Sequence, residues 1–127
     1  MSNKKKIVVM IDEYAELSRN PQTRKTVEKL LQFGAGVGIH VVMATQRLAK
    51  EVITPAFQAS LSTVVCCRVG EKSTSKFALG QYGAEKLLGK GDMLYKDGGG
   101  TLTRLQAGYV FERDTQEVVQ RIREKYA

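Results

Sequence analysis

Short apolar runs alternate with amphipathic stretches along the chain. Unbroken apolar runs and clusters of β-branched residues predict strands, and apolar residues at three- and four-residue spacing predict helices. The predicted strands are residues 7–11, 39–44, 63–69, 93–95 and 102–111. The predicted helices are residues 23–33, 55–61, 73–79 and 84–88, with a last helix that begins at Asp114.

This alternation favours a single α/β domain over residues 1–127, with three layers built around a mostly parallel sheet. The glycine-rich segment 96–100 is typical of a turn. The last two strands are therefore expected to form a small antiparallel extension near the C-terminus. Asp114 is a candidate N-cap for the last helix. That helix is expected to pack through Val118, Val119, Ile122 and Tyr126.

Two acidic residues, Asp12 and Glu13, directly follow the first predicted strand. Open α/β sheets bind their ligands at the carboxyl ends of the strands. In ATPases with a phosphate-binding loop, the first acid of such a pair holds the Mg²⁺ shell, and the second orients and polarises the attacking water. The alternative interpretation is a solvated turn or a helix N-terminus.

The second predicted strand ends in a hydroxyl, an amide and a guanidinium, from Thr45, Gln46 and Arg47. If the first two strands are neighbours, these groups face the same site as the acids. Gln46 is then placed to hydrogen-bond a γ-phosphate or a water molecule. A solvated loop is the alternative for this segment.

No window of the sequence matches the phosphate-binding pattern G-x-x-x-x-G-K-[ST]. If the chain belongs to an ATP-driven motor, it corresponds to the part of the motor domain that begins just before the second nucleotide-binding motif, the acid pair Asp12 and Glu13. By itself, it is expected to be inactive as an ATPase. The physical reason is that backbone amides of the phosphate-binding loop supply most of the phosphate contacts.

Composition narrows the possible classes of protein. The length of 127 residues leaves room for one domain, and the net charge of +7 favours polyanionic partners such as nucleic acid. No apolar run approaches the roughly 18 residues of a membrane span, so a cytoplasmic location is expected. Cys66 and Cys67 are interpreted as core residues, and His40 is the only histidine, so no cluster of metal ligands is expected.

Three segments and their order resemble the motor domain of the FtsK/SpoIIIE family of DNA translocases. They are IVVMIDEYAEL, GIHVVMATQR and QYGAEKLLGKGDMLY, with RLQAGYVF after them. The resemblance covers about residues 7 to 125. It implies a RecA-like ATPase that uses Mg²⁺ with ATP, assembles as a homo-hexameric ring and moves double-stranded DNA. It also leaves room for a membrane anchor in a region before this chain.

The resemblance implies a role for each residue that matches a family motif. Asp12 and Glu13 match the Walker B pair, so Asp12 is expected to hold Mg²⁺ through Mg-ATP, and Glu13 to be catalytic. Gln46 matches the polar sensor and is also expected to be catalytic. Thr45 is expected to lie beside the nucleotide. The glycines of the third segment, Gly89 and Gly91, are expected there too, because they allow close backbone approach, although simple turns are the alternative.

The implied DNA contacts are basic. Arg47 matches the base of a channel-facing loop, and Lys72 and Lys76 lie in a second basic loop. Lysine suits phosphate contacts, which position a protein without reading sequence.

This sequence departs from the family pattern in three places. Ala35 stands where relatives commonly carry an arginine, which leaves open the source of an arginine that acts on a neighbour's nucleotide. Leu48 stands where a proline is usual. Thr74 and Lys76 replace a more usual aspartate and arginine, which affects the DNA-loop assignment only slightly.

Other functions remain open at this point. A type VII secretion ATPase shares the architecture but moves polypeptides, and a conjugative or mobile-element DNA motor fits equally well. A non-catalytic assembly module is a further alternative. A phosphoacceptor receiver domain needs an acid after a middle strand, where this chain has Thr45-Gln46-Arg47.

The resemblance also predicts a gap in the sheet. In RecA-like sheets the strand of the phosphate-binding loop lies between the strand that ends in Thr45 and the strand that contains Cys66 and Cys67. Without it, residues 39–44 and 63–69 are expected to pair directly, or another copy of the chain is expected to satisfy their edges.

Overall fold

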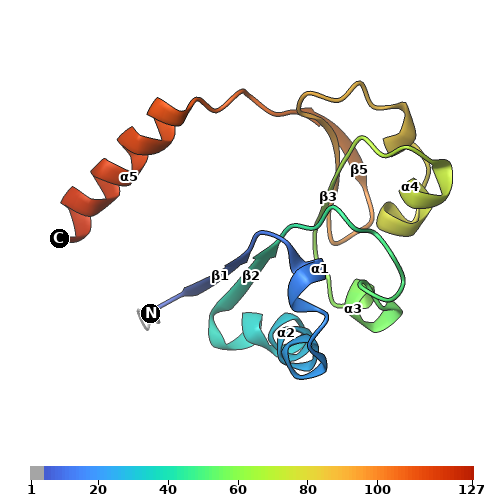
Figure 1. Cartoon of the computed structure of the whole chain (residues 1–127), viewed down its shortest axis with the longest axis horizontal. Coiled ribbons are helices and arrows are strands. Elements are labelled where there is room, and N and C mark those ends of the chain that lie inside the picture. Colours follow the sequence, from blue (N-terminus) through green and yellow to red (C-terminus); the bar gives the residue numbers. More distant parts are fainter. Residues whose placement is uncertain (1–4) are drawn as a thin grey trace.

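The computed structural model describes residues 5–127 (Figure 1). Each predicted strand forms at least in part, and each predicted helix forms except that residues 84–88 give only a 3₁₀ turn at Ala84–Lys86. The strands are β1 (Ile7–Ile11), β2 (Ile39–Met43), β3 (Val64–Cys67), β4 (Asp92–Lys96) and β5 (Leu102–Gln106). The α-helices are α1 (Tyr14–Leu17), α2 (Pro21–Phe33), α3 (Pro55–Ala59), α4 (Lys72–Leu79) and α5 (Glu112–Tyr126). Two short 3₁₀ helices, η1 (Gly34–Val37) and η2 (Ala84–Lys86), complete the described elements.

The strands form two sheets. β1 and β2 are parallel, in register from Ile7 opposite Ile39 to Ile11 opposite Met43. The connection between them runs through α1, α2 and η1, as parallel pairing requires. β3, β4 and β5 form an antiparallel sheet in that order. The α/β class and the antiparallel part near the C-terminus are thus confirmed, while the parallel part within the described residues is one strand pair.

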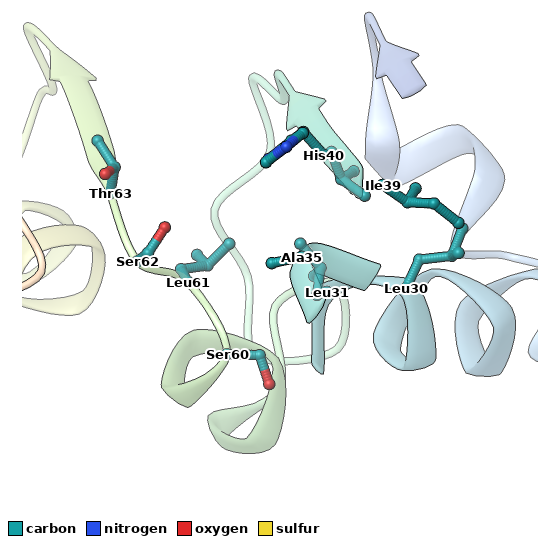
Figure 2. A pocket seen from close by; sticks show the side chains of 10 residues that line it. Leu30, Leu31, Ala35, Ile39, His40, Ser60, Leu61, Ser62 and Thr63 are labelled. Carbon is teal, nitrogen blue, oxygen red and sulfur yellow. The ribbon is translucent and has the colours of Figure 1, made fainter. Parts of the chain in front are cut away.

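Direct pairing of residues 39–44 with residues 63–69 was one of two expected arrangements, and it is wrong; pairing of these edges with another copy of the chain stays a prediction. Over residues 5–127, β2 pairs with β1 and β3 pairs with β4, and no ladder joins β2 to β3. A pocket of about 170 Å³ lies there instead, with His40 on one side and residues 60–63 on the other (Figure 2). β3 pairs with β4 on one edge instead, and its other edge has no strand partner within residues 5–127.

Each sheet is associated with its own small core. Tyr14 and Phe57 stack with ring centroids 4.8 Å apart at the centre of the first cluster. The second cluster contains Cys66 and the residues Leu79, Ala84 and Leu87. Helices α3 and α4 are joined by the Gln58 side chain, which donates a 2.6 Å hydrogen bond to the carbonyl of Phe77. Cys66 is a core residue as predicted, but Cys67 is exposed because alternation along β3 turns it to the other face.

Helix α5 lies apart from the rest of the molecule, beyond an irregular segment at residues 107–111 (Figure 1). Residues 107–111 were predicted as part of the last strand, which instead ends at Gln106. The predicted packing of the helix is also wrong, because it has no buried residue. Its apolar residues are exposed: Val118, Val119, Ile122 and Tyr126.

The start of α5 differs from the prediction as well. Phe111 is the N-cap, and Asp114 lies in the first turn, where its Oδ2 accepts a 3.1 Å hydrogen bond from the Phe111 N–H. Among the described helices, none is long and apolar enough to span a bilayer.

Candidate functional site

Glu13 joins the ends of the two parallel strands. It follows β1 as the N-cap of α1, and its Oε1 accepts a 3.1 Å hydrogen bond from the Ala15 N–H. The same oxygen accepts a 2.5 Å hydrogen bond from the Thr45 hydroxyl, and Oε2 accepts a 2.9 Å bond from the Gln46 N–H. The carboxylate therefore fixes the segment after β2 directly beside the segment after β1.

The surrounding donors stabilise the charged form of Glu13. The Thr45 hydroxyl, followed by the amides of Gln46 and Ala15, lowers the pKa of the Glu13 carboxyl below its ordinary value. The group is therefore ionised at neutral pH. An ionised carboxylate is well suited to orienting a polar group by hydrogen bonding.

Backbone bonds hold the same two strand ends together. The Ala44 N–H donates to the Ile11 carbonyl at 2.8 Å, and the Tyr14 N–H donates to the Ala44 carbonyl at 2.9 Å. Asp12 lies between these bonds with an exposed side chain. The sequence expectation that the acids and the polar end of the second strand share one edge of a sheet agrees with this geometry.

The glycines of the third motif are not hydrogen-bonded to this edge. Gly89, Lys90 and Gly91 all have positive φ, at 83°, 53° and 91°, and form the turn before β4. The turn is tied to the end of β5, because the Gly91 carbonyl accepts a 2.8 Å bond from the Ala107 N–H. A Cβ at residue 91 would lie 3.0 Å from the Ala107 carbonyl oxygen, so Gly91 serves close backbone packing.

Sequence reasoning missed an ion pair between a buried carboxylate and an exposed guanidinium beside that turn. Asp92, only 5% exposed, accepts hydrogen bonds from Nε and Nη2 of Arg104 at 2.8 and 2.6 Å across the β4–β5 ladder. Its Oδ2 also accepts a 2.7 Å bond from the Leu88 N–H. The Arg104 hydrogen bonds, with that of Leu88, lower the pKa of Asp92 from 3.8 to about 2. Only the strand register would have revealed this pair.

We expect Arg104→Gln to make the protein more sensitive to acid. With a depressed folded-state pKa, Asp92 contributes stability that is complete above its unfolded pKa and is lost as the pH falls toward about 2. Without the guanidinium the folded-state pKa rises, so the midpoint of acid unfolding, followed by circular dichroism, should move to higher pH. Arg113→Gln is the control, because it breaks an exposed ion pair to Asp114. Equal midpoints for the two variants would contradict the assignment.

The basic residues that were expected to contact DNA lie in two places. Arg47 is exposed in the segment between β2 and α3. Lys72 and Lys76 were expected in a loop, but they lie exposed on the helix α4. The Lys76 Nζ lies 5.6 Å from the centroid of the Tyr82 ring. Within residues 5–127, no group of three or more histidine, cysteine, aspartate or glutamate side chains is arranged to hold a metal ion.

No family model matches the chain. Individual relatives do match it. The chain is 43% identical over 115 residues to the DNA translocase FtsK of Rhizobium meliloti, and 39% identical over 121 residues to that of Caulobacter vibrioides. These alignments cover 89% and 94% of this chain. The chain is homologous to a segment of the FtsK DNA translocases.

The FtsK relatives are much longer than this chain. The aligned segment spans 13% of the Rhizobium protein and 15% of the Caulobacter and Treponema pallidum proteins, the last at 39% identity. The shared segment is therefore a small portion of an FtsK translocase.

Solved structures agree with the relationship to FtsK-like ATPases. The pCW3 conjugation coupling protein TcpA, determined with ATPγS, matches 94% of this FtsK-related chain with a TM-score of 0.76 and 25% identity, over 38% of its own length. The cytoplasmic domain of the type VII secretion ATPase EccC from Thermomonospora curvata matches 86% of the chain with a TM-score of 0.75. At 24% identity, and over 13% of the EccC chain, this second likeness concerns the fold alone.

Proposed function

We propose that this chain is part of an ATP-driven motor that translocates double-stranded DNA. The observation that carries the proposal is the junction at which Glu13 binds Thr45 and Gln46, in a chain homologous to FtsK. In the assembled motor, β1 and β2 would belong to a larger, mostly parallel RecA-like sheet. The motor would be a cytoplasmic homo-hexameric ring, with or without a membrane anchor elsewhere in the protein.

The nucleotide side of the proposal uses the acids after β1. Among the described residues, the Asp12 carboxylate makes no hydrogen bond within the chain and is exposed, and such oxygen donors suit Mg²⁺. When bound with ATP, Mg²⁺ would neutralise phosphate charge. Glu13 would orient the attacking water, and the Gln46 side chain would contact the water or the terminal phosphate. Thr45 contributes by holding Glu13.

The DNA side of the proposal uses Arg47, Lys72 and Lys76. The net charge of +7 supports a polyanionic partner. All three cations are exposed, and phosphate contacts of this type bind without sequence preference.

A salt titration of DNA binding tests the DNA side. Lys72→Ala with Lys76→Ala should lower the affinity for a fluorescein-labelled duplex and should flatten the dependence of log K on log salt by about two, because each phosphate contact releases roughly one counterion. Fluorescence anisotropy measures both quantities, and duplexes of unrelated sequence should give the same result.

The matched control is Lys25→Ala with Lys29→Ala, which removes the same charge from exposed positions on α2. This control should keep most of the affinity and the slope. An unchanged slope in the α4 variant, or an equal loss in both variants, would place the DNA elsewhere.

A conjugative or mobile-element DNA motor is the second candidate. The likeness to the coupling protein TcpA supports it, because that likeness covers nearly the whole chain. Both candidates require the same acids and the same DNA contacts, so the salt titration bears on each of them.

A further inference from the structure

Helix α5 carries an apolar stripe that no other part of residues 5–127 covers. Residues three and four positions apart share one face of a helix, which places the stripe along a single side of α5. Figure 1 shows the helix extended away from both sheets. The members of the stripe are all exposed: Val118, Val119, Ile122 and Tyr126. An exposed apolar stripe with charged residues on both sides is typical of an interaction surface.

The stripe has a two-fold pattern about the midpoint between Val118 and Val119. Thr115 and the exposed N-cap Phe111 extend it toward the start of the helix. Each of its positions before the midpoint has a counterpart at the same distance after it. Two copies of α5 packed antiparallel would therefore bring these counterparts face to face. The facing pairs are Val118 with Val119, Thr115 with Ile122, and Phe111 with Tyr126.

The charges beside the stripe are complementary in the same antiparallel arrangement. At about 100° per residue, Glu112 and Arg123 lie along one side of the stripe, and Asp114 and Lys125 lie along the other. Antiparallel pairing puts Glu112 of one helix beside Arg123 of the second, and Asp114 beside Lys125. Among residues 5–127, Glu112, Arg123 and Lys125 make no salt bridge. Parallel pairing would instead bring the two acidic first turns together, and such charge patterns set the orientation of helix pairs.

We propose that α5 is a self-association surface, through which two copies of this chain pair by antiparallel packing of their α5 helices. A second copy is the partner because both the stripe and its flanking charges are complementary to themselves, as the symmetric interface of a two-fold dimer requires. A ring uses head-to-tail contacts between two different surfaces. The α5 contact is therefore separate from the proposed ring, and it does not rest on the proposed function.

The contact between two α5 helices is small. Each helix has 15 residues, and a standard stable interface buries roughly 1,600 Å², more than such a pair supplies. We therefore expect a dimer that forms at high protein concentration and dissociates on dilution.

Sedimentation velocity of the 127-residue chain over a range of concentrations tests the contact. The wild-type protein should exchange between monomer and dimer. Ile122→Asp places a charge in the stripe and should weaken the dimer about ten-fold or more, because the charge would be buried without a partner. Val37→Asp is the matched control, since Val37 is a 67% exposed apolar residue outside α5, and it should leave the dimer unchanged.

Three outcomes of this experiment would overturn the proposal. They are a wild-type protein that is monomeric at every concentration, a dimer that survives Ile122→Asp, and an equal loss in both variants. Circular dichroism should show the same helix content in all three proteins, because both substituted residues are exposed.

A charge exchange tests the flanking residues. In the dimer, Arg123→Glu or Glu112→Lys turns both Glu112–Arg123 contacts into repulsive pairs, so each variant alone should dimerise on the order of ten-fold more weakly. In a mixture of the two variants, every facing pair is again of opposite charge. The mixed dimer, followed by energy transfer between two fluorescent labels, should therefore regain the wild-type affinity. A mixture as weak as the separate variants would refute the assignment of these contacts.

Disulfide trapping tests the orientation. Cys67→Ser first removes the exposed native thiol. Thr115→Cys and Ile122→Cys are then introduced into separate proteins, which are mixed and mildly oxidised. A mixed disulfide dimer is the expected main product, because the two positions face each other in the antiparallel pair. Dimers that join two identical variants would show parallel packing and would overturn the antiparallel assignment.

Discussion

Replacing Glu13 with glutamine is expected to remove nearly all ATP turnover from a motor assembly that contains this chain, while nucleotide binding is retained. The amide oxygen of glutamine can still accept from Thr45 or Gln46, so the local fold should persist. The neutral amide cannot polarise or accept a proton from water as a carboxylate does. The expected loss of kcat is about 10²–10⁴-fold, the range for a positioned acid–base group.

The control for that experiment is Glu16→Gln. Glu16 lies on the same short helix α1 and has the same charge, but it is exposed and, within residues 5–127, pairs only with Arg19 at 2.9 Å. Steady-state ATP hydrolysis and binding of a fluorescent nucleotide should be measured for both variants. If Glu13→Gln turned over ATP at the wild-type rate, Glu13 would be a helix cap and a strand-end clamp without a catalytic role.

Phe57→Ala is expected to cause the largest loss of stability, about 3–5 kcal/mol of the free energy of unfolding. The Phe57 side chain is 2% exposed, and its ring stacks on Tyr14, which follows Glu13 in the sequence. Truncation would leave a cavity in a cluster of only a few buried residues. This cluster includes Tyr14 and so lies next to the candidate site at Glu13. Urea unfolding followed by circular dichroism measures the change.

Phe33→Ala is the matched control for this prediction. It removes the same side chain from the last residue of α2, where the ring is 64% exposed. Its midpoint in urea should stay close to that of the wild-type protein, because little apolar surface leaves the core. Similar losses for the two variants would mean that the Tyr14–Phe57 cluster is not the main source of stability.

The sequence was most informative where local patterns determine structure. Apolar runs identified the cores of the strands, because strands of α/β sheets carry continuous apolar runs, although β1 is largely exposed in this chain. The meeting of Glu13 with Thr45 and Gln46 followed from the rule that parallel strands bring their carboxyl ends to one edge of a sheet. From the sequence, a helix N-terminus was only the alternative interpretation of Glu13, because the hydrogen bonds that make it a helix cap depend on atomic positions.

Long-range choices were less predictable. Whether β3 would pair with β2 or with β4 depends on competition between strands that periodicity does not describe. The pairing of Asp92 with Arg104 depends on the same register. Gly89 and Gly91 looked equally suitable for a ligand and for a turn, because positive φ serves both. The last helix has the apolar spacing of a packed helix, but spacing alone does not supply a surface for it.

The division into two sheets has a consequence for the order of folding. β4 and β5 are joined by the short segment 97–101, so their ladder closes a small loop and can form on the microsecond timescale of hairpins. β1 and β2 are separated by residues 12–38, which include the whole of helix α2. This long loop must close before the two strands can pair. The entropy cost of closing the loop comes before any contact between the strands forms, so pairing of strands distant in sequence is slow. The antiparallel half should therefore be organised early, and the edge that carries Glu13 and Thr45 should be completed last.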